Sequence, residues 1–130
     1  MIKPTNIAVS LCFRDFDGDP DQITQAIGLS PTVAYIAGDK TPAGRTVSRA
    51  FWCLSLSSEN SLDLNCVLEH SFKRIELLHG NILELTRKMK GEKYLGVGIS
   101  VGETTPAIYL TGPMISRIAQ LGLDFDIDLF

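Results

Sequence analysis

Four segments of the chain place apolar residues at every second position, and this period restricts the possible fold more than any other feature. The segments lie at about residues 7–13, 50–57, 93–101 and 124–130. Successive side chains of a β-strand point to opposite faces, so each segment would present one apolar face and one small or polar face. The apolar faces have to be buried together, and the sequence therefore predicts a β-sheet at the centre of the fold.

Helical patterns fall between these strands. Apolar residues recur at helical spacing from Leu64 to Leu78, and Gly80 is expected to separate this helix from a second, shorter one. A further helix is expected at Pro113–Leu121, because proline suits a first helical turn and Gly122 suits the position after a helix end.

Short apolar runs at residues 33–36 and 107–111 add two predicted strands. A chain of 130 residues is the size of one ordinary domain and buries roughly two thirds of its unfolded surface. We therefore expect a single α+β domain over residues 1–130, with about six strands in one mixed or antiparallel sheet and the helices gathered on one face.

The two ends of the chain resemble each other. Each has a predicted strand, a helix, a Gly-Leu pair and another strand, with Gly28-Leu29 in the first unit and Gly122-Leu123 in the second. Glycine can adopt the left-handed conformation that ends a helix, and the leucine can supply the apolar contact that accompanies it. The sequence thus predicts two strand-helix-strand pseudo-repeats, in a ferredoxin-like arrangement.

Four aspartates fall within residues 15–21, a density that suggests a calcium loop. An EF-hand loop counted from Asp15 would need glycine at position 6 and glutamate at position 12, where this chain has Pro20 and Ala26. The same residues fit a helix start better, because Asp19 suits the N-cap and Pro20 the first turn. We expect a helix over residues 20–27, with a loose surface cation site as the alternative.

Composition excludes several classes of protein. A net charge of −3 argues against nucleic-acid binding, which requires a basic surface. No apolar run approaches the 18 residues of a membrane span, and the apolar run before Arg14 is too short for a signal peptide. The three cysteines lie in apolar segments without paired spacing. The sequence predicts a reduced, soluble, cytoplasmic protein without a membrane partner.

No motif supplies a catalytic or metal-binding set. Residues 98–102 match the G-x-S-x-G pattern of a nucleophile elbow, but a strand rather than a helix is expected after them, and no histidine follows. We find no cysteine or carboxylate that forms a ligand set with either His70 or His79. We therefore expect no catalytic residues, no metal and no cofactor.

The outward face of the predicted sheet is unusual, because exposed sheet faces normally carry charged and long polar side chains. The inward face is expected to hold Val9, Leu11, Trp52, Leu54, Val97, Ile99, Ile108 and Leu110. The outward face would hold Ala8, Ser10, Cys12, Phe51, Cys53, Ser55, Gly96, Gly98, Ser100, Ala107 and Tyr109. Such small residues permit close approach by another surface. The loop at residues 38–49, a second copy, another protein or a small molecule could cover it.

The last predicted strand places Asp124, Asp126 and Asp128 in a row on one face. Three like charges in line repel one another, so they either face water at a sheet edge or meet a basic partner or a cation.

Several short stretches, spread over nearly the whole chain, together match the pattern of one known family. They are Asp17, Asp19-Pro20-Asp21, Ile23-Thr24, Gly28-Leu29-Ser30-Pro31-Thr32, Gly38-Asp39, Phe51-Trp52-Cys53-Leu54 and Leu121-Gly122-Leu123-Asp124-Phe125-Asp126-Ile127-Asp128. In these residues the sequence resembles the bacterial family catalogued as domain of unknown function 4279. The resemblance implies a cytoplasmic bacterial protein, without implying an activity; some small bacterial α+β proteins of this kind are toxin-neutralising immunity proteins. One segment differs from the family, because residues 94–101 are rich in Gly and Ser here.

Two functional hypotheses follow. The first is a non-enzymatic protein-interaction module whose partner is another protein or a second copy of the chain, bound through the outward sheet face, including Phe51 and Tyr109, or through the row of aspartates. The second is a small-ligand binder or weak enzyme, in which hydrogen-bonding groups lie beside an aromatic wall. Its site would comprise Thr24, Thr32, Gly38, Asp39 and Trp52.

Overall fold

The computed structural model describes residues 2–130 and contains five strands in one sheet. In chain order they are β1 (Asn6–Arg14), β2 (Val33–Tyr35), β3 (Phe51–Asn60), β4 (Glu92–Ser100) and β5 (Asp124–Leu129). Their order across the sheet is β2-β3-β1-β4-β5, so the first strand of the chain occupies the centre. The four strands from β2 to β4 pair antiparallel, whereas β5 runs parallel to β4.

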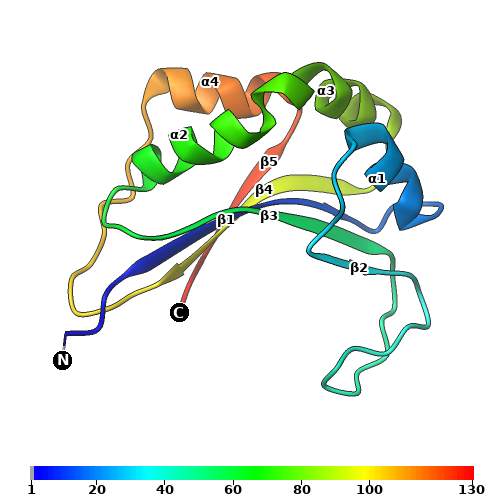
Figure 1. Cartoon of the computed structure of the whole chain (residues 1–130), viewed down its shortest axis with the longest axis horizontal. Helices are drawn as coiled ribbons and strands as arrows, with labels where there is room; N and C mark the ends of the chain where they lie inside the picture. Colours follow the sequence, from blue (N-terminus) through cyan, green and yellow to red (C-terminus); the bar gives the residue numbers. More distant parts are fainter. Residues whose placement is uncertain (1) are drawn as a thin grey trace.

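The helices are α1 (Pro20–Ile27), α2 (Leu64–Ile75), α3 (His79–Lys88) and α4 (Gly112–Gln120), with a single 3-10 turn, η1 (Glu76–Leu78), between α2 and α3. All of them lie on one side of the sheet (Figure 1). The core lies between these two layers, and α2 packs directly on β1 and β3. Fully or almost fully buried strand residues include Ile7, Val9, Leu11, Phe13, Trp52, Leu56, Leu95, Val97 and Ile99. The predicted α+β class, with helices on one face, is confirmed.

The acidic stretch forms the start of α1, as the sequence predicts. Asp19 is the N-cap, with extended backbone, and its carboxylate accepts a hydrogen bond of 2.9 Å from the N–H of Asp21. Pro20 is buried in the first turn, where its missing N–H leaves no intrahelical bond unmade.

The expected Gly-Leu helix ends are confirmed, but the pseudo-repeats are not. Gly28 and Gly122 both have positive φ, 84° and 72°, which a left-handed helix end favours. The strands that follow differ, however. β5 pairs in parallel with β4, whereas β2 is three residues long and pairs with β3 instead of β1. Only the C-terminal unit is therefore a strand-helix-strand unit with neighbouring strands.

The predicted sixth strand at residues 107–111 is wrong. This segment makes a single isolated bridge, Ala107 to Asp63, and the Thr111 side chain caps α4 instead. Both sides of β4 are already occupied, by β1 and β5, so no position remains beside it. Ile108 and Tyr109 therefore lie outside the sheet and are exposed, contrary to the faces assigned to them above.

The expected break at Gly80 is also wrong. Gly80 lies inside α3, and the helical path changes earlier, at the 3-10 turn after Ile75. No helix within residues 2–130 combines the length and the apolar character needed to span a bilayer.

Candidate functional site

The sheet face turned away from the helices, here called the outer face, is the first candidate site. Strand pairing places its residues in rows that run across the sheet. One row is Val33, Cys53, Cys12, Tyr94 and Asp124, from β2 to β5. Further along the strands, the row Ala8, Gly98 and Asp128 has two small residues before the carboxylate. The sequence predicts this face correctly for β1, β3 and β4.

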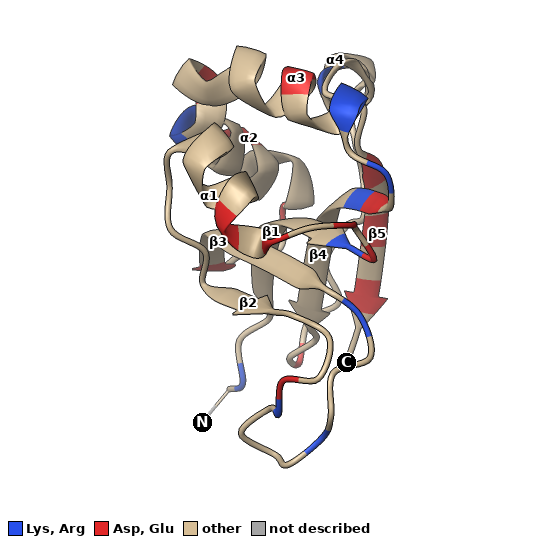
Figure 2. Ribbon diagram, turned by 90° about the vertical axis from the view of Figure 1, so that its right-hand side faces the viewer, with Lys and Arg blue, Asp and Glu red and all other residues tan. Residues whose placement is uncertain are grey.

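Charge on the outer face is confined to its margins. Asp124, Asp126 and Asp128 are exposed and lie along β5, the sheet edge, as predicted. At one end of the sheet Arg14 forms an ion pair with Glu92, across β1 and β4. Figure 2 shows the acidic positions along β5, with β3 and β1 free of charge over most of their length. The centre of the face is uncharged, and one edge is strongly acidic.

Aromatic rings cover part of the glycine positions on β4. The Tyr94 ring lies over Gly96, and the Phe130 ring lies over Gly98, each within 3.4 Å of the place where a Cβ would stand. The Arg14 guanidinium lies 5.2 Å from the centre of the Tyr94 ring. Partial burial, followed by the nearby Cys12, raises the pKa of the Tyr94 hydroxyl to about 12, so this side chain is neutral near pH 7.

The loop at residues 38–49 does not account for the outer face. It folds into a small hairpin of its own, in which the Gly38 N–H donates to the Val47 carbonyl, and Lys40 bridges to Thr46. Figures 1 and 2 show it projecting from the end of the sheet at β2 and β3, on the side opposite the helices. On the central strands, Ala8, Ser10, Gly96, Gly98 and Ser100 of the outer face are half-buried and Cys12 is buried, so most of this face is partly accessible.

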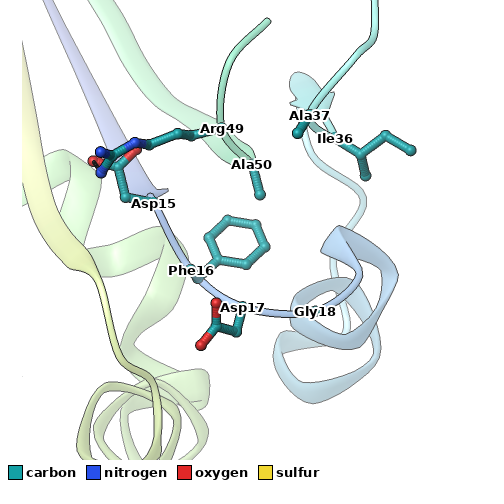
Figure 3. Close-up of a pocket in the computed structure, with 8 residues that line it drawn as sticks. All are labelled: Asp15, Phe16, Asp17, Gly18, Ile36, Ala37, Arg49 and Ala50. Carbon is teal, nitrogen blue, oxygen red and sulfur yellow. Dashed lines mark ion pairs between the residues drawn. The ribbon is translucent and has the colours of Figure 1, made fainter.

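A cavity of about 440 Å³ opens at the base of this loop and is the second candidate site. Figure 3 shows the Phe16 ring at its centre, with Asp15 and Arg49 on one side and Ile36 and Ala37 on the other. Phe16 is buried and supplies an apolar floor. Asp15 and Arg49 form an ion pair of 3.3 Å on the rim. The cavity thus offers an apolar surface beside one carboxylate and one guanidinium.

The backbone of this rim is strained. Asp15 has a φ of 60°, an uncommon conformation for a residue with a side chain. It is held by a hydrogen bond from its N–H to the Ala50 carbonyl and by the backbone of Gly91, whose Cα lies against the Asp15 carbonyl. Strained residues of this kind are often found at ligand sites, and Asp15 lines the same cavity.

The structure does not bring the five predicted ligand residues together. Trp52 is fully buried on the inner face, and its indole N–H donates to the Thr24 hydroxyl at 3.0 Å. The Thr32 hydroxyl accepts from the Ser55 N–H. Gly38 and Asp39 lie at the base of the hairpin, where they pair with Val47, and the Asp39 carboxylate accepts from the Ile36 N–H. All five residues have structural contacts, and the cavity of Figure 3 is lined by their neighbours Ile36 and Ala37.

Sequence reasoning missed one polar set, because it assigned no partner to His70. Its Nδ1 lies 2.8 Å and 2.9 Å from the two Glu59 carboxylate oxygens, and its Nε2 lies 3.8 Å from Cys66 Sγ. Cys66 and His70 are four residues apart, and this helical spacing is the signal that could have found them.

The order of thiol, imidazole and carboxylate resembles a nucleophilic triad, but the surroundings do not support catalysis. Cys66 and His70 are exposed, so water reaches the thiol freely. The Cys66 N–H, which could otherwise face a developing oxyanion, is bonded to the Asp63 carboxylate. Within residues 2–130 no group of three or more His, Cys, Asp or Glu side chains is placed to hold a metal ion.

Comparisons with curated proteins and with solved structures gave no match. The family described as Domain of unknown function (DUF4279) matches residues 4–130, which is almost the entire chain, and it is the family that the Asp-Pro-Asp helix start, the tryptophan strand and the terminal row of aspartates resemble. The chain therefore belongs to the DUF4279 family.

Proposed function

We propose that this protein is a non-enzymatic protein-interaction module that binds a partner on the outer face of its sheet. The observation that carries the proposal is the contrast between the two faces: helices cover one, and the other lies open with a small, uncharged centre (Figure 1). Backbones approach closely where side chains are small, so such a face suits a flat contact with another polypeptide.

The acidic edge favours a partner with basic side chains. Asp124, Asp126 and Asp128 lie along the same face, and no ion pair within residues 2–130 involves any of them. Lysine or arginine on a partner would therefore relieve their mutual repulsion. A toxin neutralised by an immunity-type protein would be one such partner. A second copy of the chain would bring another acidic edge and is the competing occupant that the experiment below distinguishes.

Replacing Ala8 by arginine should weaken partner binding strongly. Ala8 lies on β1, the central strand of the outer face, opposite Gly98, and the long side chain would occupy the contact without entering the core. We expect affinity to fall by about tenfold or more, because central interface positions carry most of the binding energy. The matched control is Ser116→Arg on α4, which adds the same charge at an exposed position on the helical side.

A partner protein is first recovered together with the chain from its source cells. The complex is then reconstituted from the two purified components, and its affinity is measured by titration. Exchange of the three β5 aspartates for asparagine should slow association and reduce its salt dependence. Light scattering during size exclusion separates the competing case: a wild-type dimer that Ala8→Arg dissociates would identify a second copy as the occupant and refute a basic partner. Equal affinities for Ala8→Arg and Ser116→Arg would exclude the outer face altogether.

A second candidate function is binding of a small charged molecule in the cavity of Figure 3. The observation that favours it is the strained Asp15, paired with Arg49 beside the apolar floor of Phe16. This cavity lies at the base of the loop that the sequence suggested, although it uses different residues. A ligand with an apolar body and one ionic group would match it.

Filling this cavity should remove ligand binding without unfolding the protein. Ala37→Phe places a ring at the mouth, whereas Ala43→Phe, at the exposed loop tip, is the matched control. In a fragment screen followed by amide chemical shifts, we expect hits that shift residues 15–18 and 49–50, are lost in Ala37→Phe and persist in Ala43→Phe. Shifts that survive in both variants would show that the fragments bind elsewhere.

A further inference from the structure

Two cysteines face each other across the centre of the sheet. Cys12 on β1 and Cys53 on β3 are directly opposite in the antiparallel register, and both side chains lie on the outer face. Their Sγ atoms are 2.7 Å apart, although both cysteines are free thiols. The residues are 41 positions apart in the chain, so the fold itself has brought them together.

This geometry favours a covalent bond between the sulfurs over a shared metal ion. Directly opposite residues in an antiparallel pair have Cα atoms about 4.5–5.5 Å apart, within the range that a disulfide spans. Forming the bond needs the sulfurs to approach to about 2.05 Å, a shift that side-chain rotation can supply. Two thiolates on one tetrahedral zinc ion would instead lie roughly 3.8 Å apart, so the pair would have to separate.

The two sulfurs are not equivalent. Cys12 is 4% exposed, whereas Cys53 is partly open to solvent on the outer face. A hydrogen bond from the Cys12 thiol, with a further one from Ser10, lowers the pKa of the Cys53 thiol below its usual value. The same contact with Cys53, together with burial, raises the pKa of Cys12. The accessible sulfur is thus the one with the lowered pKa, whereas the pKa of the buried sulfur is raised.

We propose that Cys12 and Cys53 form a redox-sensitive dithiol, in which Cys53 is the attacking sulfur and Cys12 the resolving one, and that its oxidant is a hydroperoxide. The Cys53 thiolate attacks the terminal oxygen of the hydroperoxide, so that an S–O bond forms and the O–O bond breaks. The leaving alkoxide or hydroxide takes a proton from solvent, and Cys53 becomes a sulfenic acid.

The second step closes the disulfide. The Cys12 sulfur attacks the Cys53 sulfur, forming the S–S bond as the S–O bond breaks, and the departing hydroxide combines with the Cys12 proton to give water. In total, two thiols and one hydroperoxide give one disulfide, one alcohol (or water) and one water. The protein loses two electrons, and the peroxide gains them.

This inference is independent of the interaction proposed above, because it concerns the thiols themselves. The disulfide would fix β1 to β3 at the middle of the outer face and close a long loop of chain, which restricts the unfolded state and should raise the melting temperature. Oxidation would also remove the thiol contact that lies beside Tyr94.

The test uses the 130-residue chain carrying Cys66→Ser, which leaves Cys12 and Cys53 as its cysteines. With one equivalent of hydrogen peroxide we expect both thiols to disappear in a thiol-reagent titration and the intact mass to fall by two hydrogen atoms. A peptide map should join Cys12 to Cys53, and a dithiol reductant should restore both thiols. Sulfinic acid, or disulfide-linked dimers in place of the internal bond, would overturn the proposal.

Single-cysteine variants test the assignment of roles. Cys12→Ser should accumulate a Cys53 sulfenic acid that dimedone traps, whereas Cys53→Ser should leave Cys12 unmodified over the same time. Equal peroxide reactivity in the two variants would contradict the roles. Because a change at either cysteine can disturb the sheet, iodoacetamide labelling of the reduced Cys66→Ser protein provides a second measurement: Cys53 should be alkylated at least about tenfold faster than Cys12, and the reverse order would also overturn the roles.

Discussion

Trp52→Ala should destabilise the protein by about 3–5 kcal/mol, the usual range for removing a large aromatic side chain from a core. Trp52 is fully buried, its ring meets Phe13 edge-on at 5.7 Å, and its indole N–H is bonded to Thr24. Since small domains are stable by only about 5–15 kcal/mol, this loss would leave a marginal fold. Urea unfolding followed by circular dichroism measures it, because the variant has no tryptophan left to report by fluorescence.

Two further variants separate the contributions of the ring and the hydrogen bond. Trp52→Phe keeps most of the ring volume, and Thr24→Val keeps the ring but leaves the indole N–H without its partner. We expect Thr24→Val to lose about 1–3 kcal/mol, the cost of one buried unpaired donor. A Trp52→Ala variant within about 1 kcal/mol of wild type would be incompatible with a buried tryptophan at this position.

Gly91→Ala should also lower the stability of the protein strongly, although it adds a single methyl group. Gly91 has a φ of 105°, and a Cβ built there would lie 2.7 Å from the carbonyl oxygens of both Arg14 and Asp15. Backbone strain alone costs about 1–3 kcal/mol, and the two backbone contacts add to it because neither oxygen can rotate away. The strained Asp15 on the rim of the Figure 3 cavity would have to move as well.

Gly80→Ala is the matched control, because it makes the same chemical change with the opposite expected sign. Gly80 lies in α3 with nothing within 4 Å of the added methyl group, so alanine should stabilise the helix by about 0.5–1 kcal/mol. Chemical denaturation of both variants gives the comparison. If Gly91→Ala were as stable as Gly80→Ala, the turn before β4 could not have the close backbone approach described here.

Local chemistry explains which parts of the fold the sequence could predict. The start of α1 is correct to the residue, because an aspartate before a proline satisfies the helix end by itself. The faces of β1, β3 and β4 also follow from the two-residue period, which assigns each side chain without knowledge of its neighbours.

The errors concern features that only distant residues decide. Residues 107–111 alternate like a strand, yet a strand needs a free edge beside it, and β5 takes that place next to β4. The sequence shows an aromatic ring at Trp52 and a hydroxyl at Thr24, which favours a ligand site, but it does not show that the buried indole donates to the half-buried hydroxyl. The contact of Glu59 with His70 likewise depends on where the end of β3 meets α2.

The central position of β1 has a consequence for how the chain folds during synthesis. When β1 leaves the ribosome, neither of its neighbours in the sheet has been made: β3 ends at Asn60 and β4 at Ser100, and the sheet needs both. Contacts between such distant segments delay folding, because much chain has to be ordered before they form. Until then the edges of β1 are open to pairing with other chains, so the nascent chain is exposed to aggregation until both neighbouring strands have been made.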